Sequence, residues 1–241
     1  MNIRIEKAAS EFRTRHGFTN LDPIRLKSLL LKLNVITIFK PLSENFSGMA
    51  VKEGDYRFML INSRHSIGRQ HFSICHELYH LYIQKDFIPH HCSAGLFDKK
   101  TEHEYKADLF AAYLLMPKDG IINLIPECEL DKDRITLETI LKIEHYFSCS
   151  RNALLVRLKE LKLISQVSVE RFKVEIIKSA KKYGYDASLY RSGNEGVIVG
   201  DFGTLAKQLF DKEKISEGHY FDLMNSIGFD ALNDSDIDEA H

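Results

Sequence analysis

Residues 69–84, RQHFSICHELYHLYIQ, contain two histidines four positions apart, with a glutamate directly after the first. Four residues are about one turn of an α-helix, so the imidazoles of His76 and His80 would project side by side and could share one metal ion. On a helical wheel that starts at Phe72, the apolar residues form a buried stripe and both histidines fall just off its edge. The stretch therefore predicts a helix at the rim of the core, with a metal site where a cleft can open.

The glutamate gives this motif its chemistry. Zinc accepts neutral imidazole nitrogens, and a catalytic zinc site keeps one position open for water. Glu77 cannot reach the metal from its place on the helix, but it can take the proton of that water and pass it to a leaving amine. Chance is the alternative, because H-E-x-x-H arises by accident in roughly one such sequence in 25. A catalytic reading therefore requires a third ligand elsewhere in the chain.

A second predicted helix, TEHEYKADLFAAYLLM (residues 101–116), offers that ligand. Glu104 and Asp108 lie on one face of it together with alanines, and two carboxylates at the head of an apolar face are costly to bury without partners. A metal removes this difficulty. Glu104 would bind it, and Asp108, one turn later, would accept the N–H of a ligating histidine.

Other roles remain open for the start of this helix. Thr101 and Glu104 fit a capping box, in which the glutamate would bond to the backbone and not to a metal. Glu102 is a rival ligand, although it points away from the apolar face. His103 also lies off that face and is expected to be exposed.

The segments RQHFSICHELYH and EYKADLFAAYLLMP together resemble the ImmA/IrrE family of bacterial metallopeptidases. That family pairs an HExxH helix with a downstream E-x-x-A-x-x-F-A-x-x-L-L-M-P helix, and the resemblance extends over roughly residues 20–165. The second motif is matched without departure, by Glu104, Ala107, Phe110, Ala111, Leu114, Leu115, Met116 and Pro117. The resemblance implies a zincin-like fold in which zinc is bound by His76, His80 and Glu104, with Glu77 as the catalytic base and Asp108 behind a ligand.

The resemblance also implies a partner. Family members studied as peptidases cut an HTH-type (Xre-like) repressor encoded beside them, which releases a mobile element, a prophage or a stress response from repression. We therefore predict a zinc-dependent endopeptidase that cleaves one specific repressor or antitoxin and so controls gene expression. The alternative is a non-cleaving regulatory module that senses stress or sequesters a regulator, and the intact Glu77 favours catalysis.

Composition restricts where the protein works. Charged residues make up 28% of the chain and the net charge is −1, so no global basic field favours nucleic acid or an anionic membrane. No stretch approaches the length of a membrane span, and the N-terminus lacks the apolar region of a signal peptide. Four widely spaced cysteines indicate reduced thiols rather than a disulfide framework. We expect a cytoplasmic protein.

The order of elements predicts an α+β fold with helices around a small antiparallel sheet. A helix over residues 3–15, a helix that begins at Asp22-Pro23, a strand at 35–39 and a hairpin that turns at Glu53-Gly54-Asp55 precede the first motif. The strand at 56–62 is a candidate edge strand, to which a substrate could add as a further strand. Two helices, 134–147 and 150–163, follow the second motif. A helix at 168–183 and a glycine-containing hairpin come next.

These elements divide into three predicted domains. Residues 1–120 form the zincin-like metallopeptidase domain, residues 121–165 a helical, HTH-like extension, and residues 166–241 a small α+β domain with an acidic tail. The helix pair of the extension could read DNA, but an ordinary hairpin that covers the core is favoured because few of its residues are basic.

Several other residues are weaker candidates for the site. We interpret His90-His91-Cys92 as ordinary residues of a loop and not as metal ligands, and Cys75 as a packing residue. The group that would stabilise the oxyanion is left open among Tyr79, Tyr113, His65 and His103.

Overall fold

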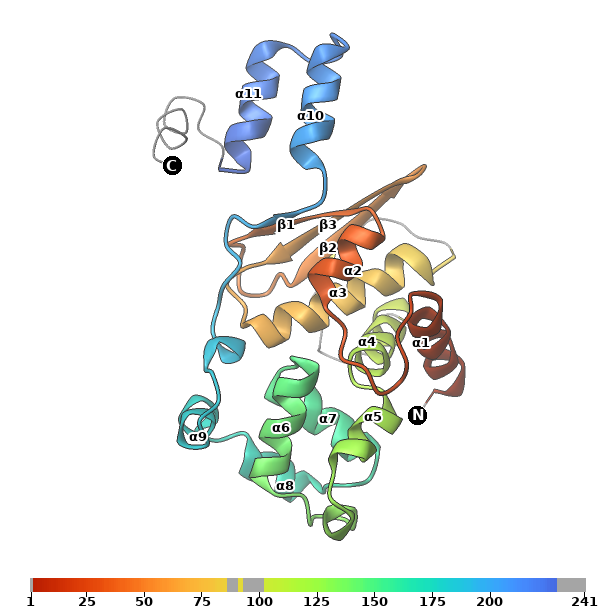
Figure 1. Ribbon diagram of the computed structural model, residues 1–241, viewed down its shortest axis with the longest axis vertical. Coiled ribbons are helices and arrows are strands. Elements are labelled where there is room, and N and C mark those ends of the chain that lie inside the picture. The colour runs from red at the N-terminus through yellow and green to blue at the C-terminus, as the bar shows by residue number, and fades with distance from the viewer. Residues whose placement is uncertain (1, 86–90, 93–101, 229–241) are drawn as a thin grey trace.

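The computed structural model describes residues 2–85, 91–92 and 102–228, and only the backbone of 91–92. It confirms an α+β fold, built on a five-stranded sheet in the order β4-β2-β3-β1-β5 (Figure 1). The strands are β1 (Val35–Lys40), β2 (Gly48–Glu53), β3 (Tyr56–Asn62), β4 (His91–Cys92) and β5 (Ile198–Val199). The sheet is mixed rather than wholly antiparallel, because β1 and β3 run parallel.

The predicted hairpin is present as β2 and β3. Its register pairs Glu53 with Tyr56, which leaves a two-residue turn. Gly54 occupies that turn with a φ of +53°, a conformation that glycine adopts without steric cost. The strand at 56–62 is not an edge strand, however. β3 lies in the middle of the sheet with β2 on one side and β1 on the other, so its backbone groups are already paired.

Four helices build the upper part of the core. These are α1 (Ile3–Arg15), α2 (Leu26–Lys32), α3 (Ile67–Tyr82) and α4 (Glu102–Leu115). Helix α3 contacts β2 and β3 on one side and α4 on another, and α4 packs in turn against α1 (Figure 1). This layering buries nearly the whole of α3, including its polar residues. Helix α2 begins at Leu26 instead of after Asp22-Pro23, because the Asp22 carboxylate binds back to the amide and hydroxyl of Thr19.

A helical layer lies on the other side of α4 from the sheet (Figure 1). It consists of α5 (Lys118–Leu124), the short 3₁₀ helix η1 (Glu127–Glu129), α6 (Leu137–Phe147), α7 (Arg151–Glu160) and α8 (Gln166–Phe172). Helices α6 and α7 occupy the two segments predicted as helices, and the turn between them is well defined. Ser148 ends α6 in the left-handed conformation, and the Ser150 side chain caps α7 by accepting from the amide of Ala153.

The C-terminal region differs from its prediction. The helix expected over 168–183 is split into α8 and α9 (Ile176–Lys182), because Glu175 adopts a left-handed φ of 48°. No hairpin forms among the described residues that follow the 3₁₀ helix η2 (Ser188–Tyr190). Instead, β5 pairs with β1, and Ser192 makes an isolated bridge to Ser66. The boundaries predicted at residues 120 and 165 stay predictions.

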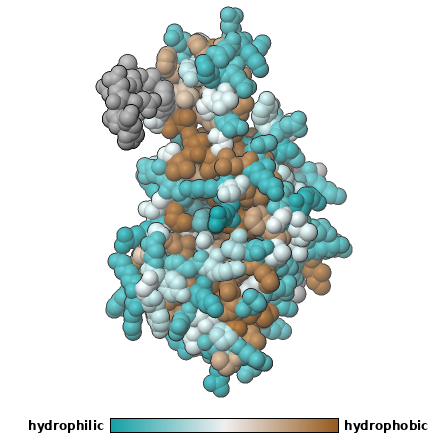
Figure 2. Space-filling view, in the orientation of Figure 1, coloured by the Kyte–Doolittle hydropathy of each residue, from teal (hydrophilic) through white to brown (hydrophobic). Residues whose placement is uncertain are grey.

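The last described helices, α10 (Phe202–Asp211) and α11 (Glu217–Ser226), pack against each other and extend away from the sheet (Figure 1). Hydrophilic residues cover much of the face drawn in Figure 2, with hydrophobic ones gathered between them. Within the described part of the chain, no helix is both long enough and apolar enough to cross a membrane.

Candidate metal centre

The two motif histidines lie side by side on α3, one turn apart. Their Nε2 atoms are 3.2 Å from each other, and both side chains are buried. The helix that carries them begins at Ile67 and ends at Tyr82, so both residues fall within its regular part. The spacing of four therefore brings the two imidazole nitrogens to one point, as the sequence predicts.

Glu104 of α4 reaches the same point from the facing helix. One of its carboxylate oxygens is 3.2 Å from Nε2 of His76, and the other is 3.2 Å from Nε2 of His80. Taken as one donor atom each, the three side chains all lie within 4.8 Å of one another. Among the described residues, this is the one cluster of three such side chains close enough to hold a single ion.

The donor set fits zinc. Two imidazole nitrogens and one carboxylate are a combination found in catalytic zinc sites, where a fourth position is left to water or substrate. With metal–ligand bonds of about 2.0–2.2 Å and tetrahedral angles, two ligand atoms are separated by about 3.3–3.6 Å. The two Nε2 atoms are 3.2 Å apart, and each lies 3.2 Å from a different oxygen of Glu104, so either oxygen is close to this range from one of the histidines.

The other ring nitrogens of both histidines have acceptors. Nδ1 of His76 is 2.8 Å from Oδ1 of Asp108, which is itself buried. Nδ1 of His80 is 2.6 Å from Oε1 of Gln84. An acceptor at Nδ1 places the proton there and leaves the lone pair of Nε2 directed at Glu104, which is the tautomer that a metal ligand needs.

Sequence reasoning missed Gln84. The signal was present, because Gln84 follows His80 by four residues, just as His80 follows His76. Gln84 is uncharged and lies beyond Tyr82, where α3 ends, so neither charge nor helical position identified it as a partner of His80. The backbone nevertheless continues to turn, since the amide of Gln84 donates to the carbonyl of Tyr79, and this brings the side chain under the imidazole.

Glu77 is fully buried next to this cluster, against the start of β2. A Cβ built at Gly48 would lie 3.2 Å from Oε1 of Glu77 and 3.1 Å from the carbonyl of Leu60. The absence of a side chain at Gly48 therefore makes the room in which the carboxylate sits. This glycine is a second residue that sequence reasoning did not assign to the site.

The cluster is deeper than the helical wheel predicts. His76, Glu77 and His80 were expected at the rim of the core, yet each is at most 1% exposed. The helical wheel assumes that α3 packs through one face, whereas the sheet covers one face of the helix and α4 covers another. Polar groups buried this completely require partners, and the facing carboxylates of α4 meet that requirement for the two histidines.

The rival residues at the start of α4 lie elsewhere. Glu102 and His103 are both exposed, and Glu102 pairs with Lys106 one turn along the helix. Thr101, the other half of the predicted capping box, lies outside the described residues, as do the side chains of His90-His91-Cys92. The Cys75 thiol is fully buried, and this burial raises its pKa to about 12, so it stays protonated and acts in packing.

The candidates for oxyanion stabilisation separate in space. Tyr79 packs edge-on against His80, with 5.5 Å between ring centroids. His65 lies before α3, where its Nε2 is 3.0 Å from the carbonyl of Glu44. Tyr113 lies at the far end of α4, and its hydroxyl donates to Glu160 over 2.5 Å.

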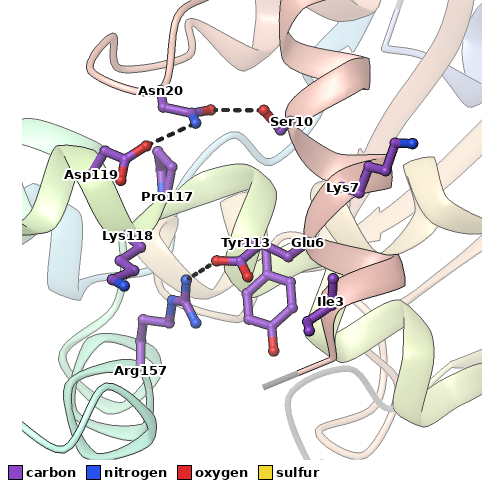
Figure 3. A pocket seen from close by; sticks show the side chains of 10 residues that line it. All are labelled: Ile3, Glu6, Lys7, Ser10, Asn20, Tyr113, Pro117, Lys118, Asp119 and Arg157. Atoms are coloured by element: carbon purple, nitrogen blue, oxygen red, sulfur yellow. Dashed lines mark hydrogen bonds and ion pairs between the residues drawn. The ribbon is translucent and has the colours of Figure 1, made fainter.

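Tyr113 borders a separate pocket of about 260 Å³ formed by α1, α4, α5 and α7. Figure 3 shows the Arg157 side chain reaching toward Glu6, with 3.7 Å between the nearest charged atoms. The Arg157 guanidinium also stacks over the Tyr113 ring at 4.3 Å and pairs with Glu160 at 2.7 Å. These contacts join the helices that surround the pocket.

Two basic residues of the predicted HTH-like pair are likewise internal. Arg151 is buried against Glu144 on α6 and donates to the carbonyl of Phe172. Arg157 is buried in the network at the end of α4. Because both guanidinium groups are committed to contacts inside the protein, neither is presented to a nucleic acid in this structure.

Comparison with known proteins identifies one matching family. The model of the IrrE N-terminal-like domain, a peptidase family, matches residues 32–159. This span includes the whole of α3 and α4, and with them His76, Glu77, His80 and Glu104. No curated protein matches the chain.

Proposed function

The chain belongs to the family of IrrE N-terminal-like peptidase domains, and from this membership we propose that it is a zinc-dependent endopeptidase. One observation carries the proposal: His76, His80 and Glu104 converge within 4.8 Å in the interior, with Glu77 beside them. A bound zinc ion supplies a Lewis acid that polarises a carbonyl and acidifies water.

The residues of the chain divide the remaining work. His76 and His80 would hold the ion through Nε2, because their Nδ1 atoms face Asp108 and Gln84. Glu77 accepts a proton from the attacking water and returns it to the amine of the departing peptide. Gly48 leaves the Glu77 carboxylate the space it occupies. The burial of His76, Glu77 and His80 excludes bulk water, so the electrostatic contacts among these side chains are stronger than they would be at the surface.

We further propose that the substrate is a protein of the HTH-type (Xre-like) repressor or antitoxin class, and that its cleavage controls gene expression. The resemblance of the two motifs to the ImmA/IrrE family supports this choice.

The experiment pairs the purified chain with the HTH-type protein encoded next to it. We expect the zinc-loaded wild type to cut this partner at a discrete position. Addition of a chelator should stop cleavage, and Glu77→Gln should abolish it while the zinc content stays that of the wild type. Glu102→Gln serves as the matched control, because Glu102 is exposed on α4 and faces away from the cluster.

Two results would count against the proposal. A wild-type protein that holds zinc and binds the partner, yet leaves it intact, would identify a non-cleaving binding module instead. Full activity in Glu77→Gln would remove the base from the mechanism.

A further inference from the structure

A second hollow, of about 420 Å³, opens at the start of α3. We call it the arginine hollow, and its lining residues are Glu44, Arg64, His65, Ser66 and Arg69. One wall is the loop between β1 and β2, and the other is the first turn of α3 with the residues before it.

The wall made by the loop is held in place. The buried Asn62 amide donates to the carbonyls of Ser43 and Phe46, over 2.8 and 2.7 Å, and its oxygen accepts from the amide of Leu42. On the other side, Nε2 of His65 is 3.0 Å from the carbonyl of Glu44. The hollow is therefore preformed, and a ligand that enters it does not have to order the loop first.

The hollow carries net positive charge. Two arginines face one glutamate, while burial lowers the pKa of His65 and keeps its imidazole neutral at pH 7. Among the described residues, the hydrogen bond found for the Arg69 guanidinium is a long one of 3.4 Å to the Ser47 hydroxyl, and no carboxylate lies within 4 Å of it. Burial lowers the pKa of Arg69, and the more distant Glu44 opposes this shift. A partly desolvated guanidinium of this kind binds a carboxylate through two parallel hydrogen bonds.

The hollow is aligned with the metal centre. Arg69 precedes His76 by seven residues, so the two side chains leave α3 within about 20° of the same direction and about 10.5 Å apart along the axis. The Arg69 side chain shortens this distance, because its guanidinium contacts Ser47 and the next residue, Gly48, adjoins Glu77. An extended peptide advances about 3.3 Å per residue, so at most about three residues separate the hollow from the metal centre.

We propose that the arginine hollow is a specificity subsite, which binds an aspartate or glutamate side chain of the substrate within about three residues of the bond that is cut. This inference rests on the proposed peptidase function and adds the substrate class to it. Arg69 is the principal contact, and Arg64, exposed at the mouth of the hollow, adds attraction at longer range.

The test uses the zinc-loaded full chain and a mixture of random-sequence decapeptides with blocked termini, with the cleavage positions identified by mass spectrometry. The wild type should prefer peptides with Asp or Glu within about three residues of the cut by about tenfold, the effect of one charge-assisted hydrogen bond. Arg69→Gln should remove this preference, and Arg69→Glu should shift it toward Lys and Arg. Arg4→Gln, an exposed arginine on α1, is the matched control.

The outcomes distinguish the subsite from the peptidase function. Cleavage by the wild type without any preference for acidic residues would overturn the subsite and leave the peptidase intact. The same preference in wild type, Arg69→Gln and Arg64→Gln would also overturn it. If the zinc-loaded wild type cuts neither the peptides nor the neighbouring HTH-type protein, the proposed function fails and the subsite fails with it. Should Arg69→Gln not fold, Arg64→Gln decides, because its exposed side chain leaves the core untouched and should reduce the preference in part.

Discussion

Replacement of Asp108 provides the sharpest test of whether the chain orients His76 as a metal ligand. Oδ1 of Asp108 lies 2.8 Å from Nδ1 of His76, and both side chains are buried. Asp108→Asn keeps the size of the side chain and an acceptor oxygen but removes the negative charge. Asp108→Ala removes the acceptor as well and leaves a buried N–H to be satisfied in some other way.

The size of the effect follows from this geometry. Loss of a partner behind a ligating histidine lowers metal affinity by about 10–100-fold, or about 1.4–2.8 kcal/mol. A buried N–H without an acceptor costs about 1–3 kcal/mol. We therefore expect zinc affinity to fall about tenfold in Asp108→Asn and closer to a hundredfold in Asp108→Ala.

Zinc affinity is measured by competition with a chromogenic chelator at fixed pH, with circular dichroism to check the fold. Glu102→Gln is the control, because it removes a carboxylate from the same helix at an exposed position. If both Asp108 variants bind zinc as the wild type does, the histidine does not depend on Asp108. An equal loss in the control would trace the effect to α4 as a whole.

Three further predictions concern other parts of the chain. Gln84→Ala should weaken zinc binding about tenfold by freeing the imidazole of His80, and Gln84→Glu should restore it, in the same chelator competition. Arg151→Ala should lower the free energy of unfolding by about 3–5 kcal/mol in urea titrations, because the buried Glu144 carboxylate loses its cationic partner. An unchanged urea midpoint would show that the ion pair does not stabilise the fold. A hydrogen bond from Ser168 lowers the pKa of Asp133 in the folded protein. The ionised Asp133 carboxylate therefore stabilises the fold at any pH above its ordinary pKa, and this stabilisation is lost as the pH falls through the pKa of the folded state. The Tm of Asp133→Asn should accordingly lie below wild type at pH 7 and approach it as the pH falls below the ordinary pKa of 3.8.

Local signals predicted the elements whose information lies within a few residues. The helix over 3–15 and the hairpin at Gly54 both occur as expected, and α3 and α4 occupy the two motif segments. Each depends on periodicity, on a turn residue or on a stop such as Pro117, which the chain displays locally. The sequence also predicted that the motif residues lie together. The buried histidines of one helix and the carboxylates of the other can become partners only if the two helices face each other.

The remainder depends on contacts between distant segments. Strand order decided that 56–62 lies inside the sheet, and no local pattern distinguishes a central strand from an edge strand in so short a run. The position of Gly48 against Glu77 depends on how β2 crosses α3. Glu175 interrupts the expected helix by adopting a left-handed conformation, which glutamate rarely adopts and which the sequence therefore does not predict. In each case tertiary packing overrides the local preference.

The start of α3 illustrates how far such control extends. The Gln70 amide lies within hydrogen-bond distance of the carbonyls of Ser63, His65 and Gly193, and its oxygen accepts from Asn194. Residues 193 and 194 lie outside the matched family span of 32–159, yet they fix the turn from which α3 begins. Helices are stiff over this length, so a shift at Gln70 is carried two turns onward to the ligands, where separations near 3 Å leave little tolerance. The segment around Gly193 and Asn194 therefore helps to place the helix that carries His76 and His80.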